Sequence, residues 1–160
     1  MKIKHRKLLH ALNIQYGAFS AQTLRVDLKQ LATIFTQTEL MSHFQPDGVI
    51  LKESFDHFLE IRYQKQLIGY YKISIFDFSN EIELHAGITL LNPFLNRSYF
   101  NLTKQFVWEI SACFPSHQIA IWVDRENKKI LSLLDFVGFQ KSSKPILKGT
   151  FEHYFFPSKN

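Results

Sequence analysis

The sequence has little cysteine, glycine, proline or tryptophan: one, six, five and two residues respectively among 160. The single cysteine, Cys113, excludes an intrachain disulfide framework. The low glycine and proline content argues against collagen-like and low-complexity chains. There is also no long uninterrupted apolar run that could span a membrane. We therefore expect a globular, cytoplasmic protein that does not enter membranes.

What is present indicates one compact domain over residues 1–160. Hydrophobic residues make up 46% of the chain and charged residues 21%, and sixteen phenylalanines predict a packed aromatic core. A chain of roughly 150 residues can bury about two-thirds of its unfolded surface. The net charge of +5 is compatible with an anionic cofactor or a nucleic acid, and alone it favours neither. A nucleic-acid-binding domain would rest only on this charge and on a basic N-terminal helix, so we do not expect it.

An extra helix is predicted at about residues 2–15, before the main pattern begins. Its apolar and basic residues recur at helical spacing, which gives the helix a basic side. The residues in the two rows are Ile3, Lys7, His10 and Ile14, and Leu8, Leu9 and Leu12. A docking arm is a more common role for such a helix than binding to nucleic acid or a membrane.

The rest of the pattern predicts a mixed sheet flanked by helices. A short strand enters a helix within residues 22–35, with Asp27 as the helix cap. Residues 57–63 and 67–76 predict an antiparallel hairpin, and 81–90 alternates as a half-buried strand. A helix over 98–114 and a strand over 118–123 follow, then a helix over 127–139 and a final hairpin over 146–156. A strand, crossover helix and strand indicate a parallel pair, so the fold class is α/β (α+β) with a mainly antiparallel sheet.

Three local features resemble the GNAT family of N-acetyltransferases. They are the spacing from Asn127 to Gly138-Phe139, the Leu24-Arg25 strand before Asp27, and the Ile68-Gly69 pair in a strand. The texture is similar to the branch with ribosomal-protein N-terminal and amino-sugar acetyltransferases, in which Asn-Pro precedes the cofactor loop, as Asn92-Pro93 does here. The resemblance covers almost the whole chain from about residue 20 and implies the GNAT fold.

The resemblance implies a site for acetyl-CoA or another acyl-CoA between the parallel strands 81–90 and 118–123. There the pantetheine arm would pair with exposed backbone groups, with Ile88 and Leu90 at the cofactor. The pyrophosphate would lie at the N-terminus of the following helix, near Arg97 and Ser98. The chain departs from the family here, because residues 95–101 contain no glycine and carry bulky Tyr99 and Phe100. Alternatively, Arg97 is only solvated and Ser98 is only a helix cap.

The resemblance also indicates where the chemistry would take place. Two residues before Gly87, where relatives often carry a catalytic carboxylate, stands His85, with Glu83 on the same strand face. A histidine titrates near neutrality and suits a general base. The family's proton-donating tyrosine, seven residues after Asn127, is replaced by Leu134. Asn127 would contact the cofactor or simply start its helix.

The activity implied is acyl-CoA-dependent N-acyl transfer to a primary amine, carried by a small molecule or a protein. The alternative is a catalytically degenerate GNAT-like domain that serves as a binding or regulatory module. Seven histidines are scattered without metal-ligand spacing, so no metal site is expected. The sequence leaves open the acceptor, the acyl length, and whether the chain is a monomer or a homodimer.

Overall fold

The computed structural model describes residues 2–24, 54–76, 80–88 and 97–157. Its elements are α1 (Lys2–His10), β1 (Asn13–Tyr16), β2 (Phe19–Thr23), β3 (Ser54–Tyr63), β4 (Gln66–Phe76), β5 (Glu81–Ile88), α5 (Arg97–Cys113), β6 (Gln118–Asp124), α6 (Lys128–Val137), β7 (Gln140–Lys141) and β8 (Phe151–Phe156). The strands form one sheet in the order β1-β2-β3-β4-β5-β6-β8-β7. Only β5 and β6 are parallel within the described residues, which confirms the predicted fold class.

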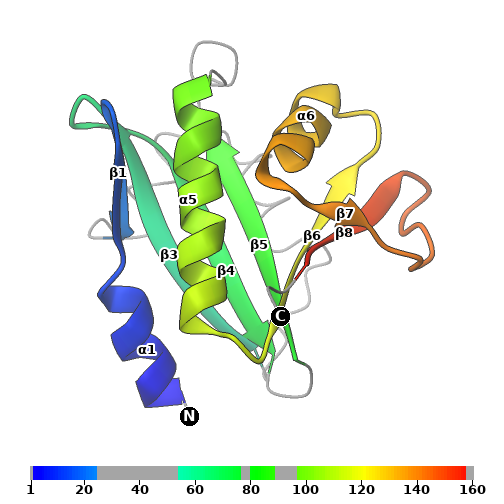
Figure 1. Cartoon of the computed structure of the whole chain (residues 1–160), viewed down its shortest axis with the longest axis horizontal. Helices are drawn as coiled ribbons and strands as arrows, with labels where there is room; N and C mark the ends of the chain where they lie inside the picture. Colours follow the sequence, from blue (N-terminus) through cyan, green and yellow to red (C-terminus); the bar gives the residue numbers. More distant parts are fainter. Residues whose placement is uncertain (1, 25–53, 77–79, 89–96, 158–160) are drawn as a thin grey trace.

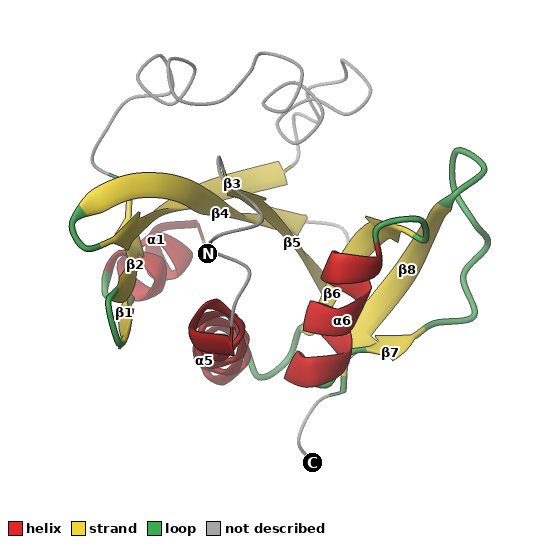
Figure 2. Cartoon of the chain, turned by 90° about the horizontal axis from the view of Figure 1, so that it is seen from above, coloured by secondary structure: helices red, strands yellow, loops and turns green. Residues whose placement is uncertain are grey.

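The helices α5 and α6 lie on the same side of this sheet (Figures 1 and 2). The buried face of α5 is one stripe of residues, because residues three and four apart share one side of a helix. Its buried residues are Tyr99, Leu102, Thr103, Phe106, Val107 and Ile110. On the sheet side, the Tyr71 ring stacks on Phe106 with centroids 4.1 Å apart, and its hydroxyl lies 2.7 Å from Thr103 Oγ1. The core therefore forms between α5 and the sheet.

The N-terminal helix is shorter than the predicted range of about 2–15. It ends at His10, and residues 13–16 form β1, which pairs with β2. Gly17 turns the chain between these strands with a φ of +59°, a conformation that suits glycine. Ile14 is buried, and its neighbours Asn13 and Gln15 are exposed, which is strand alternation. The helical spacing of Ile14 misled the prediction, because a single apolar residue fits either period.

The predicted hairpin of β3 and β4 is confirmed. Leu59 and Ile61 are buried, and Tyr63, two residues further along β3, is half-buried. The turn of the hairpin consists of Gln64 and Lys65, which both have positive φ angles of 48° and 70°. A two-residue hairpin turn of this kind needs positive φ at both positions, although most side chains disfavour it. The Gln64 N–H donates to Ala18 O at 2.9 Å and ties this turn to the β1–β2 hairpin.

The helix after β6 begins and ends where the sequence predicts. Asn127 caps α6, with its Oδ1 accepting a hydrogen bond from Ile130 N at 3.3 Å. Gly138 adopts the left-handed conformation after the last turn, and the N–H groups of Gly138 and Phe139 both donate to Leu134 O. These bonds satisfy backbone groups that a helix end would otherwise leave unpaired.

The final hairpin differs from the prediction of paired segments within residues 146–156. The partner of β8 on its outer edge is β7, at Gln140–Lys141, and Leu147 makes only an isolated bridge with Phe151. Lys148 and Gly149 have positive φ angles, so this stretch is a turn and cannot continue as a strand. The predicted strand-helix junction at residues 24–35 lies outside the described residues, apart from Leu24.

Candidate functional site

The parallel strands β5 and β6 separate after a short paired stretch. They contain eight and seven residues, but their ladder has only three residue pairs, the last being Glu83 with Ala120. Beyond that pair, β5 continues against β4 and β6 continues against β8, with no further β5–β6 pair among the described residues. Figure 1 shows the two strands diverging toward their C-terminal ends. Facing edges therefore remain that can hydrogen-bond to an extended ligand.

The start of α5 lies at this open end (Figure 1). Arg97 is the first helical residue and is exposed, and its guanidinium carbon lies 5.6 Å from the centre of the Phe136 ring on α6. Lys104 Nζ lies 5.3 Å from the same ring centre. Both are cation–π distances. Two cations therefore lie beside the helix end whose N–H groups and dipole favour an anion.

The first turn of α5 accounts for the bulky residues of the glycine-free segment. Tyr99 is 1% exposed and points into the core, with its ring 6.0 Å from that of Phe19. Phe100 is half-buried and packs against Phe136 at 5.6 Å. Ser98 lies within the first turn, so the position before the helix belongs to Asn96, outside the described residues. The helix therefore turns Tyr99 into the core and Phe100 onto Phe136, the ring beside Arg97.

The predicted catalytic pair lies on β5 at the point where the strands separate. Glu83 is the last residue paired with β6, and its side chain is half-buried. His85 follows two residues later and lies opposite Lys72 of β4 in the ladder. Ile88 ends β5 opposite Gly69, and Leu90 lies outside the described residues. The backbone thus brings Glu83, His85 and Ile88 to the edge of the opening.

Asn127 and Leu134, which the sequence analysis compared with GNAT relatives, have structural roles at α6. Asn127 is exposed and caps the helix, as described above. Leu134 is 4% exposed and belongs to the hydrophobic core. A buried aliphatic side chain cannot donate a proton, so the chain lacks a donor at this position. No other residue of α6 is a tyrosine that could donate the proton instead.

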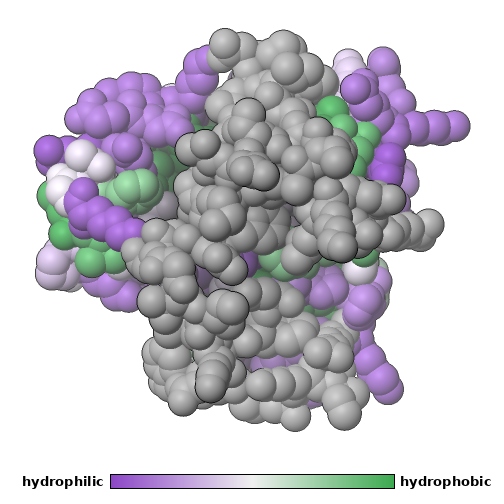
Figure 3. All heavy atoms as spheres, turned by 180° about the vertical axis from the view of Figure 1, so that it is seen from behind, coloured by the Kyte–Doolittle hydropathy of each residue, from purple (hydrophilic) through white to green (hydrophobic). Residues whose placement is uncertain are grey.

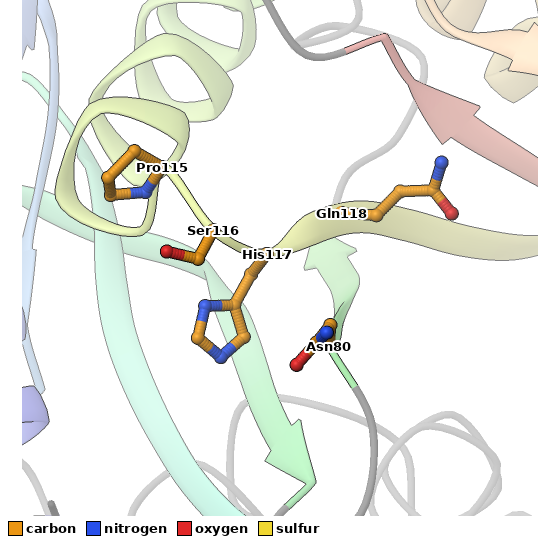
Figure 4. Close-up of a pocket in the computed structure, with 5 residues that line it drawn as sticks. All are labelled: Asn80, Pro115, Ser116, His117 and Gln118. Atoms are coloured by element: carbon orange, nitrogen blue, oxygen red, sulfur yellow. The ribbon is translucent and has the colours of Figure 1, made fainter.

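The other end of the parallel pair holds a pocket of about 180 Å³, lined by Asn80, Pro115, Ser116, His117 and Gln118 (Figure 4). Two of these residues are joined by a hydrogen bond, in which Gln118 N donates to Asn80 O at 2.6 Å. Figure 4 shows His117 and Asn80 at the N-terminal ends of the two strands. None of the predicted site residues lines this pocket, and it lies away from the open end.

A polar network beside this closed end was not predicted from the sequence. His153 of β8 is 2% exposed, and its Nε2 lies 3.0 Å from Glu81 Oε1 while its Nδ1 lies 2.7 Å from Ser142 Oγ. Lys144 Nζ donates to Glu81 Oε2 at 2.9 Å. Burial by itself would raise the pKa of Glu81, but the hydrogen bonds and charges of Lys144 and His153 outweigh it and lower that pKa. The residues are up to 72 positions apart in sequence, so no local pattern indicated the network.

Two kinds of feature are absent from the described residues. No helix there is long and apolar enough to cross a membrane. No group of three or more metal-ligating side chains occurs in the same ranges. Cys113 is half-buried. Its burial, and to a smaller extent the nearby negative charge of Glu109, raises the pKa of its thiol and so disfavours the reactive thiolate.

No protein-family model matches the sequence, and no curated protein matches it. Spermidine N-acetyltransferase from Vibrio cholerae, in complex with CoA and spermine, aligns with a TM-score of 0.64 and 16% identity, over 88% of this chain and 96% of that one. N-acetyltransferase PseH from Campylobacter jejuni aligns with a TM-score of 0.58 and 11% identity, over 89% of this chain and all of its own (100%).

An uncharacterized protein from Bacillus halodurans aligns with a TM-score of 0.65 and 12% identity, over 92% of this chain and 89% of its own. The chain has the GNAT fold. At identities this low, the likeness shows the arrangement of the backbone and does not transfer an activity. Within the GNAT fold of this chain, Glu83 and His85 lie on one strand bordering the opening, and Arg97 lies at the helix that begins beside it.

Proposed function

We propose that the protein is an acyl-CoA-dependent N-acyltransferase that transfers an acyl group to a primary amine. The observation that carries this proposal is the three-pair limit of the β5–β6 ladder, which opens the sheet beside the start of α5. Support also comes from the structural neighbours, of which several are N-acetyltransferases and one was solved with CoA and spermine. The acyl group we expect is acetyl.

The described residues fit an extended, anionic cofactor. The edges of β5 after Glu83 and of β6 after Ala120 face each other without pairing, and the amides of a pantetheine arm require such backbone partners. Ile88 and Leu90 would lie along this path. At its end, Arg97, Ser98 and the first N–H groups of α5 would hold the pyrophosphate. Tyr99 does not extend into this place because its side chain is buried in the core, and Phe100 packs against Phe136 of α6.

Acyl transfer to an amine requires a group that removes a proton from the attacking nitrogen. We assign this role to His85, assisted by Glu83, because β5 carries both to the place where the strands part. Asn127 would add a contact to the cofactor from the start of α6. The transfer would be direct, from thioester to amine, with both bound together.

One observation favours the alternative, a GNAT-like binding or regulatory module without catalysis. Leu134 is buried in the core at the position where the family carries its proton-donating tyrosine. A module of this kind would bind CoA but release no thiol from acetyl-CoA in the presence of amines. Binding and turnover must therefore be measured separately.

The binding experiment compares melting temperatures with CoA, acetyl-CoA and no cofactor. Binding to the folded state alone stabilises it in proportion to the logarithm of cofactor concentration. We expect both cofactors to raise the melting temperature, and Arg97→Ala to weaken affinity about tenfold or more because it removes a charge-assisted contact. Lys7→Ala on α1 removes an exposed cation far from the opening and is the matched control. No shift with millimolar cofactor, or equal loss in both variants, contradicts the proposal.

The activity experiment follows thiol release from acetyl-CoA with a panel of a polyamine, an amino sugar and a peptide with a free N-terminus. We expect one class of amine to be acetylated, and His85→Gln to lower the turnover about a hundredfold while cofactor binding is kept. Cofactor binding without turnover on any amine would favour the binding module. Equal turnover by His85→Gln would remove His85 from the catalytic role.

A further inference from the structure

The network at the closed end has the connectivity of an activated serine. Ser142 Oγ lies 2.7 Å from His153 Nδ1, and the opposite ring nitrogen lies 3.0 Å from Glu81 Oε1. A nucleophile within hydrogen-bond reach of a base that is oriented by a third group is the structural signature of nucleophilic catalysis. We propose that Ser142 is a nucleophile that takes up acyl groups from activated acyl donors, namely aryl esters and thioesters. This activity is separate from the acyl transfer proposed above.

The hydrogen bonds determine which atom carries each proton when His153 is neutral. His153 Nε2 lies 3.0 Å from Glu81 Oε1 and 3.5 Å from Lys144 Nζ. We assign the imidazole proton to Nε2, because the contact with the carboxylate is the shorter one and Glu81 also accepts a hydrogen bond from Lys144. His153 Nδ1 is then an acceptor, and the Ser142 hydroxyl must donate to it. A serine hydroxyl that donates to a neutral imidazole held by a carboxylate is the ground state of a catalytic triad. In this chain Nδ1 faces the serine and Nε2 faces the carboxylate.

The remaining contacts fix the serine without occupying its reactive proton. Lys144 N donates to Ser142 Oγ at 3.2 Å, and Ser142 N donates to His153 O at 2.9 Å. Trp122 packs against the His153 ring with centroids 4.8 Å apart, which holds the ring in place. His153 is buried, whereas Ser142 is half-buried. The hydroxyl is therefore the end of the network that a reagent can reach.

Apolar surface lies on the same segment as Ser142. Ile146, Leu147 and Phe151 are 45%, 48% and 37% exposed, and they account for three of the five large exposed hydrophobic residues of the described chain. Figure 3 shows apolar side chains among hydrophilic ones at the left edge of the molecule, on the side where the β7–β8 segment lies. Such a surface suits the apolar part of an acyl or aryl group. It agrees with acyl donors better than with charged or strongly polar reagents.

The reaction with p-nitrophenyl acetate illustrates the proposed step. The Ser142 oxygen forms a bond to the carbonyl carbon, and its proton passes to His153 Nδ1. The bond between that carbon and the phenolate oxygen breaks, and p-nitrophenolate leaves with the bonding electron pair. His153 then returns the proton to solvent or to the leaving group. The products are an acetyl ester on Ser142 and free p-nitrophenol, with no change of oxidation state.

The experiment incubates the purified protein with p-nitrophenyl acetate and without CoA, then maps acetylated peptides by mass spectrometry. We expect acetylation at Ser142 and none at the exposed neighbour Ser143, which lacks the imidazole contact. Ser142→Ala should abolish the fast release of p-nitrophenol, and Ser143→Ala should leave it unchanged. Acetylation of Ser143 at the same rate as Ser142 would overturn the proposal. Because no CoA is present, the result is independent of cofactor binding.

Two further variants test the role of the base. His153→Gln removes the base and should slow acetylation of Ser142 about a hundredfold. Glu81→Gln leaves His153 in place, but its amide can donate to Nε2 and favour the unproductive tautomer, so it should also slow acetylation. Circular dichroism checks that each variant is folded. If His153→Gln does not fold, a Glu81→Gln rate equal to that of the wild type overturns the proposal by itself.

Discussion

The two ends of the β5–β6 pair are built in opposite ways from the same two strands. At the N-terminal end, three residue pairs join the strands, and the Glu81–His153–Ser142 network links β5 to β8 and to the segment after β7. At the C-terminal end, the strands have no mutual pairs among the described residues, and Arg97 and Lys104 lie on the surface around Phe136. The closed end is held by burial and ion pairs, and the open end carries exposed charge.

This difference indicates how a sheet can provide a ligand site without losing stability. The free energy of folding can be concentrated at the closed end, where apolar side chains are buried and polar ones are paired. The open end then retains backbone edges and cations that contribute little to folding and remain available for a ligand. Substitutions at the two ends should therefore separate into those that change stability and those that change binding.

The largest effect is expected at the closed end, from Ile82→Ala. Ile82 is 0% exposed and lies in the paired part of β5, opposite Ile119. Truncation of a buried isoleucine typically costs about 2–5 kcal/mol, because burial is lost and a cavity remains. Ile121→Ala is the matched change on β6 beyond the last β5–β6 pair, at a half-buried site, and should cost less. Urea unfolding measures both, and equal losses would remove the distinction between the two ends.

Glu81→Gln should have the next largest effect, about 1–3 kcal/mol, because the buried imidazole of His153 and the Lys144 ammonium lose their charged partner. The network also makes stability depend on pH. The pKa of Glu81 in the folded protein lies below its ordinary value of 4.5, so its contribution is present above that value and is lost as pH falls through the folded pKa. Glu81→Gln should therefore flatten the acid limb of the stability curve.

Melting temperatures measured from neutral pH down to below pH 4.5 test this effect. Glu126→Gln is the control, because the Glu126 carboxylate is exposed and its ion pair with Arg125, at 4.0 Å, is a weak surface pair. Its acid limb should follow that of the wild type. A Glu81→Gln curve as steep as the wild-type curve would show that other carboxylates govern acid unfolding.

The sequence was sufficient where one local period determines an element. The α5 stripe, the β3–β4 hairpin and the ends of α6 at Asn127 and Gly138 follow from spacing and from end residues. The prediction failed where short apolar segments fit two periods, as at Ile14 in β1. It also failed for β7, a strand of two residues that exists only because β8 pairs with it.

The candidate site, too, has features that the sequence indicated and features that it did not. The resemblance to GNAT proteins predicted a site that includes Glu83, His85 and Arg97. The backbone of these residues lies around one opening, because the order of elements sets which strand and helix ends lie together. The sequence also placed bulky Tyr99 and Phe100 in the cofactor segment. It could not indicate where Tyr99 points, which is into the core because a helix begins at Arg97. The network of Glu81, His153 and Ser142 depends on contacts between distant segments, which spacing cannot indicate.

A smaller effect on stability is expected from Asn127→Ala at the open end. The substitution removes the cap bond from Ile130 N to Asn127 Oδ1, and loss of such a cap costs typically about 1 kcal/mol. Asn127→Asp keeps an acceptor at the cap and should retain most of the stability. Thermal unfolding compares the three proteins. If Asn127→Asp is destabilised as much as Asn127→Ala, the cap bond does not account for the loss.

The smallest effect on stability is expected from Arg97→Ala, within about 0.5 kcal/mol, because the side chain is exposed and a surface cation–π contact contributes little. Urea unfolding without cofactor measures it. The same variant is expected to lose CoA affinity, so one residue would contribute to binding while hardly affecting folding. A loss of more than about 1 kcal/mol would mean that the Arg97–Phe136 contact fastens α5 to α6. The open end would then depend on its charges for folding, as the closed end depends on Glu81.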